Sequence, residues 1–295
     1  MKLINFLNDL FKEDGFILID YNSNRYVIGK PLKEIPIELQ LLDKSMHKKL
    51  LFHPDIYFGE SYTNGSLRLR NGTLTEFLDI AFKNIGRADI NIYGKTLNKI
   101  KGTLKYLTSF NKIIKSKQNV AHHYDISEKL YDLFLDKKRQ YSCAYFKNEN
   151  DTLETAQENK IDHIIKKLHI QPNQKVLDIG SGWGTLAIDI AKKTKASVTG
   201  ITLSENQLKY SQEKAKELNL DNQVEFKLID YRQLNEKFDR IVSVGMFEHV
   251  GKKFYQTYFN RVSKMLKKDG VALIHTIGSN LPPRDPQPWI TKYLF

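Results

Sequence analysis

The sequence predicts an α/β protein in two parts, a small N-terminal α+β domain followed by a parallel sheet with helices on both faces. The first indication is that strand-like and helix-like patterns alternate over the second half, which favours crossovers between parallel strands. The second is a glycine-rich turn, GSGWG at 180–184, directly after the apolar stretch KVLDI. The third is composition, because 295 residues, 41% of them hydrophobic, suffice for two cores.

Residues 1–112 are expected to form the first domain, an accessory or lipid-binding unit that ends in a basic connecting helix. Alternating apolar residues around a polar turn predict a hairpin, and Thr73 with Glu76 forms a capping box ahead of an amphipathic helix. The expected strands are 16–21, 25–29 and 66–70.

Residues 113–295 are expected to form the second domain, in which about five strands build the sheet. The expected elements are, in order, a helix starting at Asp151, strand 176–179, helix 185–194, strand 197–203, helix 205–219, strands 224–229 and 238–244, helix 253–266 and strand 271–276. Sheets of this kind bind ligands beyond the carboxyl ends of their strands.

The net charge of +12 is unevenly distributed. No acidic residue lies between Asp89 and Asp125, where lysines alternate with apolar residues at helical spacing. This pattern fits a helix on an anionic membrane surface, while nucleic-acid binding and a solvated connecting helix stay open as alternatives.

Cys143 is the only cysteine, which excludes a disulfide framework and a cysteine-based metal cluster. With no secretory signal and no membrane-spanning run, we expect a cytoplasmic protein, peripheral on the inner face of the membrane, without a metal.

The glycine-rich turn predicts the class of ligand. Gly180, Gly182 and Gly184 allow a tight turn and a close approach of the backbone to a ligand. A dinucleotide motif would place its third glycine one position later and an acid at the tip of the next strand, and the strand ending at Leu203 has none. Alternate glycines after V-L-D instead resemble the first motif of S-adenosylmethionine methyltransferases.

Polar residues follow the other strand ends. A carboxylate and two histidines, Glu248, His249 and His275, are expected to converge on the same crevice. Ser204 and Gln207 would contact the ligand or merely cap the helix that they begin.

Several longer motifs resemble the cyclopropane-fatty-acyl-phospholipid synthases, which are related to the mycolic acid cyclopropane synthases. These motifs are YSCAYF at 141–146, VLDIGSGWG at 176–184, VTGITLSENQ at 198–207, DYR at 230–232, FDRIVSVGMFEHVG at 238–251 and HTIGSN at 275–280, with AHHYD at 121–125 and, more weakly, FGESYTNG at 58–65.

The resemblance implies that a methyl group passes from S-adenosylmethionine to a cis double bond of an unsaturated phospholipid. Proton loss from the resulting cation then closes a cyclopropane ring. A bound bicarbonate ion is the implied base, held by Cys143, Glu248, His275 and the backbone of Ile277. The cofactor residues implied by the motifs and the strand ends are Tyr141, Ser142, Asp178, Gly180, Gly182, Gly184, Thr202, Leu203, Gln207, Asp230, Tyr231 and Arg232.

The chain departs from the family pattern in two places. Ser181 replaces a cysteine usual in the glycine turn, a change between small residues. Only five strands of the family's seven are expected before Phe295, so the methyltransferase domain is expected to be C-terminally truncated, with part of the acyl pocket incomplete. The alternatives are a branched or methylene product, an inactive lipid-binding fragment and, more remotely, a nucleic-acid methyltransferase. No nucleic-acid partner is expected, and the oligomeric state, a homodimer included, stays open.

Overall fold

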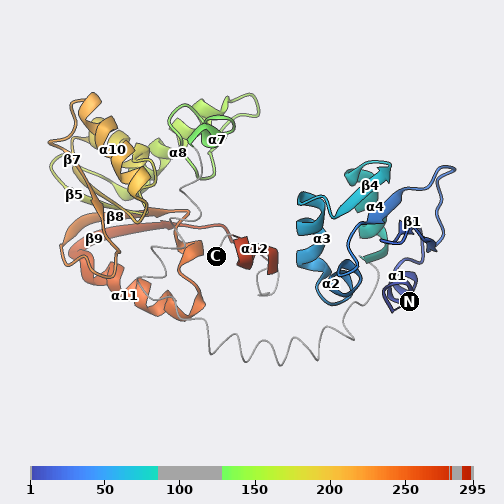
Figure 1. The fold of residues 1–295 in the computed structure, drawn as a ribbon. Coiled ribbons are helices and arrows are strands. Elements are labelled where there is room, and N and C mark those ends of the chain that lie inside the picture. Colours follow the sequence, from blue (N-terminus) through green and yellow to red (C-terminus); the bar gives the residue numbers. More distant parts are fainter. Residues whose placement is uncertain (1, 86–127, 279, 281–287, 294–295) are drawn as a thin grey trace. The chain divides into compact units, whose positions relative to one another are not determined.

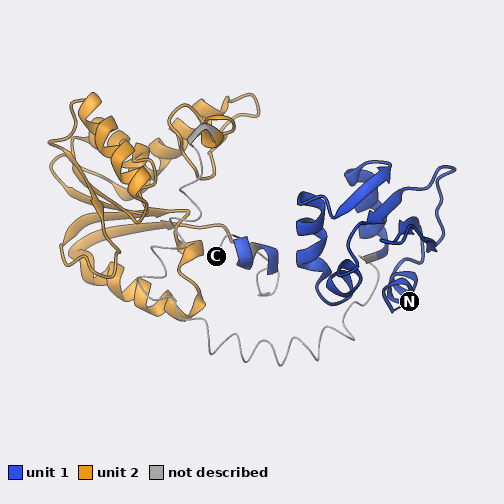
Figure 2. Cartoon of the chain, viewed as in Figure 1, with its two compact units in different colours: residues 1–110, 285–293 blue, residues 111–284, 294–295 orange. Residues whose placement is uncertain are grey.

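The computed structural model describes residues 2–85, 128–278, 280 and 288–293, which belong to two compact units (Figures 1 and 2). The first unit comprises residues 1–110 and 285–293, and the second comprises residues 111–284 and 294–295. The expected domain boundary after residue 112, the basic segment 89–125 and the motif at 121–125 lie outside the described residues.

The first unit contains a four-stranded sheet in the order β2-β1-β3-β4. Strands β1 (Phe16–Ile19) and β2 (Arg25–Ile28) pair antiparallel, which confirms the predicted hairpin. Strand β3 (Glu38–Leu41) was not predicted; it pairs parallel with β1 and antiparallel with β4 (Leu67–Asn71). Strands β1 and β2 are equally short but are joined by a tight polar turn, whereas β3 pairs with strands that are distant in sequence, so no hairpin signal marks it.

Helices enclose the apolar side of this sheet. They are α1 (Lys2–Leu10), α2 (Met46–Phe52), α3 (Pro54–Thr63) and α4 (Leu74–Ile85). The predicted capping box starts α4, because the Thr73 amide donates to Glu76 Oε2 at 2.7 Å and the Glu76 amide donates to Thr73 Oγ1 at 3.3 Å. The short helix α12 (Pro288–Tyr293) packs on α3, where the Tyr293 hydroxyl donates to Glu60 at 2.6 Å.

The described part of the second unit contains the predicted parallel sheet, with five strands in the order β7-β6-β5-β8-β9 (Figure 1). All four neighbouring pairs are parallel. The strands are β5 (Lys175–Ile179), β6 (Ser197–Thr202), β7 (Val224–Leu228), β8 (Phe238–Val244) and β9 (Leu266–His275). A short helix, α7 (Glu128–Asp132), precedes them.

Helices cover both faces of this sheet, as predicted. Alternate residues of β5 show the two faces, since Val176 packs in one core and Leu177 in the other. The Val176 core takes residues from α8 (Leu153–Leu168), α9 (Thr185–Thr194) and α10 (Glu205–Glu217). The Leu177 core takes residues from α11 (Tyr255–Met265), which lies on the opposite side of the sheet (Figure 1).

Several boundaries differ from the predictions by one to five residues, and three of these differences have a local cause. Helix α8 starts after Thr152, whose hydroxyl accepts from the Thr155 amide at 3.2 Å, while Asp151 accepts from the Lys147 and Asn148 amides. Two 3₁₀ turns, η1 (Phe247–His249) and η2 (Lys252–Phe254), come before α11. Strand β9 begins at Leu266 rather than at 271, because an irregularity in its pairing with β8 accommodates the polar residues between.

Candidate functional site

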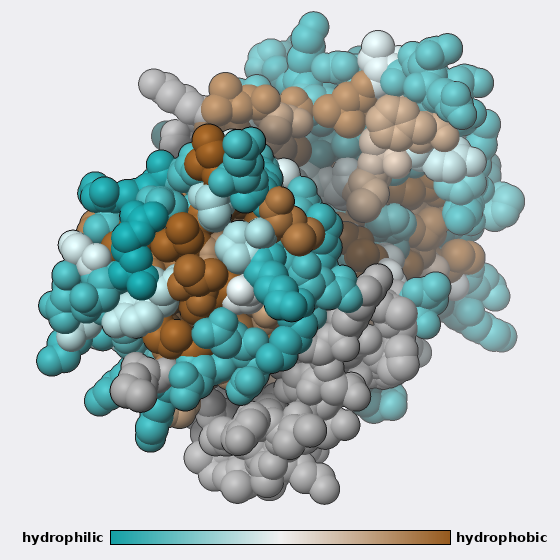
Figure 3. Space-filling view, turned by 90° about the vertical axis from the view of Figure 1, so that its right-hand side faces the viewer, coloured by the Kyte–Doolittle hydropathy of each residue, from teal (hydrophilic) through white to brown (hydrophobic). Residues whose placement is uncertain are grey.

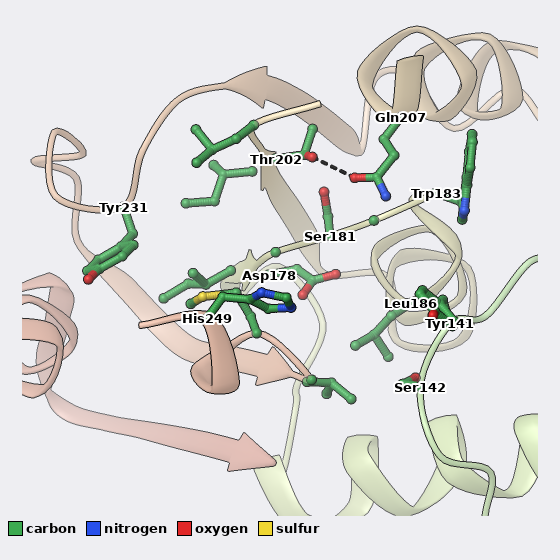
Figure 4. Close-up of a pocket in the computed structure, with 18 of the residues that line it drawn as sticks. Tyr141, Ser142, Asp178, Ser181, Trp183, Leu186, Thr202, Gln207, Tyr231 and His249 are labelled. Atoms are coloured by element: carbon green, nitrogen blue, oxygen red, sulfur yellow. Dashed lines mark hydrogen bonds between the residues drawn. The ribbon is translucent and has the colours of Figure 1, made fainter. Parts of the chain in front are cut away.

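A pocket lies at the carboxyl ends of the strands in the second unit (Figure 4). It is bordered by the turn after β5, the ends of β6 and β8, the segment that follows β7 and residues 139–142. The predicted cofactor residues that line it are Tyr141, Ser142, Asp178, Gly180, Gly182, Thr202, Leu203, Gln207, Asp230, Tyr231 and Arg232. Of the predicted cofactor residues, Gly184 alone is not part of this lining.

The three turn glycines are required for different reasons. All have positive φ angles, +82° for Gly180, +54° for Gly182 and +85° for Gly184. A Cβ on Gly180 would lie 2.8 Å from the Met246 side chain, whereas one on Gly182 would meet nothing within 4 Å, so the backbone at Gly182 is open to a ligand. A Cβ on Gly184 would lie 2.6 Å from Ser211 Cβ on α10, so Gly184 serves helix packing.

Gly200 contributes to the close packing behind the same turn. A Cβ on Gly200, in the middle of β6, would lie 2.6 Å from the Phe226 ring of β7. The same ring lies 2.8 Å from where a Cβ of Gly184 would be. The amides of Gly180 and Ser181 donate to the Ile201 carbonyl at 3.0 and 2.9 Å. The turn is therefore held against β6 by packing and by backbone hydrogen bonds.

Asp178 is the buried acid of the pocket. Its side chain sits near the end of β5, it is 2% exposed, and its Oδ2 atom has no hydrogen-bond partner. Burial raises its pKa to about 7, and the positive charge of Lys160 partly opposes this shift. An unpartnered carboxylate oxygen facing a pocket fits a cationic ligand group.

Lys160 was missed by the sequence analysis. It projects from α8, lines the pocket and is 7% exposed. Burial lowers its pKa to about 8, against the effects of Asp136, Cys143 and Asp178. A signal was present, because a lysine at this position falls on the apolar stripe of α8 that Ala156 and Ile164 also occupy. A lysine on the buried face of a helix needs a polar partner, so its position alone indicates a specific role.

Polar side chains at the ends of β6 and β7 form hydrogen bonds with residues close to them in sequence. The Thr202 hydroxyl donates to Gln207 Oε1 at 2.8 Å (Figure 4). Ser204 accepts from the Gln207 amide at 3.3 Å, so it caps α10 as its alternative interpretation predicted. Arg232 donates to both oxygens of Asp230, at 2.8 and 2.6 Å, and this bidentate pair shapes the turn beside the pocket.

The predicted base-binding residues gather at the ends of β8 and β9. The Ile277 amide donates to Glu248 Oε1 at 2.7 Å, and the Gly245 amide donates to the His275 carbonyl at 3.0 Å. Glu248 Oε2 and His275 Nδ1 are buried and have no partner. Cys143 is exposed, and no hydrogen bond to its thiol occurs among the described residues. The structure thus joins Glu248, His275 and Ile277 but shows no contact of Cys143 with them.

This group is adjacent to the pocket but separate from it. Met246 and His249, on either side of Glu248 in the chain, both line the pocket, whereas Glu248 and His275 do not. Trp183 also lines it, with its ring 5.5 Å from that of Tyr131. His249 was predicted to lie at the crevice, but Met246 and Trp183 were not.

The comparisons with known proteins agree on one family. The family model described as mycolic acid cyclopropane synthetase matches residues 111–295. The cyclopropane-fatty-acyl-phospholipid synthase of Escherichia coli K12 is 39% identical over 88% of this chain, which spans 66% of the length of that protein. A probable fatty acid methyltransferase of Pseudomonas putida is 41% identical over 54% of this chain and 41% of its own length.

Solved structures give the fold. The cyclopropane synthase MmaA2 of Mycobacterium tuberculosis is 42% identical over 54% of this chain and 56% of its own, with a TM-score of 0.53. The mycolic acid cyclopropane synthase CmaA1, solved with SAH and CTAB, is 39% identical over 54% of this chain and 55% of its own, with a TM-score of 0.52. The second unit therefore has the class I methyltransferase fold that its glycine turn predicted. On its sequence motifs, its sheet and the family model that covers residues 111–295, the chain belongs to the mycolic acid cyclopropane synthetase family.

Proposed function

We propose that this protein transfers a methylene unit from S-adenosylmethionine to the cis double bond of an unsaturated phospholipid acyl chain, forming a cyclopropane ring. The observation that carries the proposal is a pocket with an unpartnered carboxylate, Asp178, next to a second set of unpartnered groups on Glu248 and His275. A cofactor that supplies the methyl group and a base that removes a proton need two such neighbouring sites.

Phospholipid is the proposed substrate class because of where the similarity extends. The Escherichia coli relative, named for a phospholipid reaction, matches 88% of this chain, so its match extends into the first unit. The mycobacterial cyclopropane synthase structures match only 54%. The first unit is the part of the chain that we assign to phospholipid binding.

The pocket residues fit S-adenosylmethionine, which when bound supplies an electrophilic methyl group. Asp178 would accept from its ammonium group, because Oδ2 lacks a partner. Gly182 would allow close approach of the ligand, because no atom occupies the space beside it. Tyr141, Ser142 and Tyr231 would border the bound molecule. The CmaA1 structure contains the related molecule SAH.

The second set of residues fits a small oxyanion that carries one proton, and bicarbonate is the ion that we propose. Glu248 Oε2 would accept from the hydroxyl of the ion, and the N–H group of His275 at Nδ1 would donate to one of its other oxygens. The Ile277 amide is the third proposed group of this site; it donates to Glu248 at 2.7 Å in this structure and would donate to the ion in its place. Cys143 stays assigned to it from the family resemblance. In this arrangement the protein would hold a base beside the cofactor pocket.

The protein is proposed to work at the cytoplasmic surface of an anionic membrane, as a peripheral protein. Apolar side chains are exposed on the first unit, among them Val27 at 62%, Leu32 at 72% and Ile35 at 71%, and Figure 3 shows apolar surface among hydrophilic residues. The net charge of +12 favours anionic lipids. Within the described residues, no helix combines the length and the apolar character needed to cross a bilayer.

The experiment supplies purified protein with S-adenosylmethionine and vesicles of unsaturated phospholipid, and measures the mass of the lipid. We expect a gain of one methylene group per modified double bond, and NMR should show the cyclopropane protons. A branched or methylene-bearing product would instead support the related methyltransferase reaction. Vesicle binding with no mass change after long incubation would support an inactive lipid-binding protein.

The Glu248→Gln variant tests the assigned base site. It should abolish methylene transfer while leaving the binding of S-adenosylhomocysteine nearly intact, because Glu248 does not line the pocket. Glu217→Gln, on the exposed end of α10, is the matched control and should have normal activity. Unchanged turnover in Glu248→Gln would reject this role.

A further inference from the structure

Two oppositely charged side chains line the pocket without touching each other. Asp178 and Lys160 are 2% and 7% exposed, and each acts electrostatically on the other. The described residues form no ion pair between Asp178 and Lys160, so the Lys160 nitrogen lies more than 4.0 Å from the carboxylate oxygens of Asp178. Buried opposite charges that stop short of contact leave room for a ligand that carries both signs.

Both groups have unused hydrogen-bonding capacity. Asp178 Oδ2 has no partner. The Lys160 ammonium has three N–H donors and uses two, to Ser142 Oγ at 2.7 Å and to Gln157 Oε1 at 2.5 Å. Burying such groups without full compensation is unfavourable, and a complementary ligand would remove that penalty.

We propose that Lys160 is a cofactor-binding residue that receives the α-carboxylate of the amino-acid end of S-adenosylmethionine, while Asp178 receives the α-ammonium. This rests on the proposed function and deepens it. The amino-acid end is a zwitterion whose two charges branch from one carbon, so it matches two opposite groups that are near each other but not in contact. The nucleoside alone would leave both unpaired.

Lys160 also has a structural connection, which the test must separate from ligand binding. Its partner Gln157 donates through Nε2 to the Ser142 carbonyl at 3.0 Å and to the Gln140 carbonyl at 3.3 Å. Lys160 and Gln157 therefore hold the segment that carries Tyr141 and Ser142. Loss of this support would weaken every ligand, whereas loss of the carboxylate contact would weaken only ligands that carry a carboxylate.

The test compares three ligands on the full chain by calorimetry. These are S-adenosylhomocysteine, its decarboxylated analogue and methylthioadenosine, which lacks the amino-acid group. Wild type should bind S-adenosylhomocysteine about tenfold or more tighter than the decarboxylated analogue, the usual size of a charged hydrogen-bonded contact. Lys160→Met should remove this preference, and it should weaken S-adenosylhomocysteine about tenfold more than it weakens methylthioadenosine, whose loss reports the structural support alone.

Gln157→Met is the matched control, because Gln157 supports the same segment without lining the pocket. It should weaken S-adenosylhomocysteine and the decarboxylated analogue by the same factor, which keeps the preference. A wild type that binds these two ligands equally would overturn the inference without any variant. Equal weakening of all three ligands in Lys160→Met would overturn it as well.

The binding test separates this inference from the proposed function. Wild type that binds S-adenosylhomocysteine but shows no carboxylate preference rejects the role of Lys160 and leaves methylene transfer standing. Wild type that binds none of the three ligands rejects both. Lipid turnover plays no part in the measurement.

Discussion

Asp178 shows, at the level of one residue, how a group suited to ligand binding lowers the stability of the ligand-free protein. Burial raises the pKa of Asp178 from 3.8 to about 7. Between these two pH values the folded chain keeps the carboxyl group protonated, whereas the unfolded chain has released the proton. Stability from this group is therefore lost as the pH rises between about 4 and about 7. A ligand ammonium would compensate the charge that the free protein leaves buried.

Asp178→Asn should therefore raise the stability of the ligand-free protein at about pH 8, by roughly 1 to 4 kcal/mol. Near pH 4 the variant and the wild type should be about equally stable, because the wild-type carboxyl is then protonated in the fold. Urea unfolding at the two pH values measures this difference. The same variant should lose affinity for S-adenosylhomocysteine, and equal stability at both pH values would contradict the raised pKa.

The charged pair also predicts a pH dependence of cofactor binding. Asp178 is ionised above its pKa of about 7, and Lys160 is protonated below its pKa of about 8. Asp136 and Cys143 are the other charged or titratable groups that act on Lys160. Affinity for S-adenosylhomocysteine should therefore be greatest between these two values and fall on both sides. Methylthioadenosine is the control, and an identical pH profile for it would contradict the assignment.

At the level of elements, the glycine turn combines two requirements that the sequence pattern does not separate. Gly182 faces open space, whereas Gly184 begins α9 against Ser211 of α10 and Phe226 of β7. The alternate spacing predicted the turn and its ligand class because both are local properties of backbone conformation. It could not predict that Gly184 serves packing, since that depends on elements that follow later in the chain.

Alanine substitutions should separate the two requirements. Gly184→Ala should lower stability by about 2 kcal/mol or more, because the new Cβ would lie 2.6 Å from Ser211 Cβ at a positive φ angle. Gly182→Ala should destabilise the fold by only about 1 kcal/mol, from its φ angle alone, while reducing cofactor affinity. Thermal unfolding and calorimetry on both variants would measure this. Similar losses of stability in the two would contradict the distinction.

The other elements show the same limit of sequence reasoning. The five parallel strands and the cap of α4 were predicted because hydrophobic period and capping residues are local signals. The start of β9 was predicted five residues too late. Residues 267–270 have no strand pattern of their own, and they belong to the strand only through its pairing with β8. Lys160 was missed because its proposed role depends on a hydrogen bond to Ser142 and on the charge of Asp178, which lie on other segments of the chain.

At the level of the whole molecule, two compact units combine a family-specific methyltransferase unit with a smaller sheet-and-helix unit. The positive charge is a property of the entire chain, 46 basic against 34 acidic residues. Attraction of such a protein to an anionic surface extends over about one Debye length, roughly 10 Å at ordinary ionic strength. In the proposed function, charge would bring the protein to an anionic membrane, and apolar contacts would retain it there.

Binding to vesicles should accordingly depend on lipid charge and on salt. We expect sedimentation with vesicles of anionic phospholipid at low salt, at least several-fold less binding to zwitterionic vesicles, and release at about 0.5 M salt. Equal binding to both kinds of vesicle would contradict an electrostatic approach. Salt-sensitive binding to RNA without any binding to lipid would favour the nucleic-acid alternative.

The contact between Gly200 and Phe226 has a consequence for how this fold diverges. The aromatic ring fills the space that a side chain at position 200 would need, and it also lies against Gly184. Neither glycine can accept a methyl group alone. A smaller residue in place of Phe226 would remove the closest contact at position 200, whereas Ser211 Cβ at 2.6 Å and the positive φ angle would still require glycine at position 184. Homologues should therefore change positions 200 and 226 together, as a correlated pair, while glycine is kept at 184, and an isolated alanine at 200 should be rare.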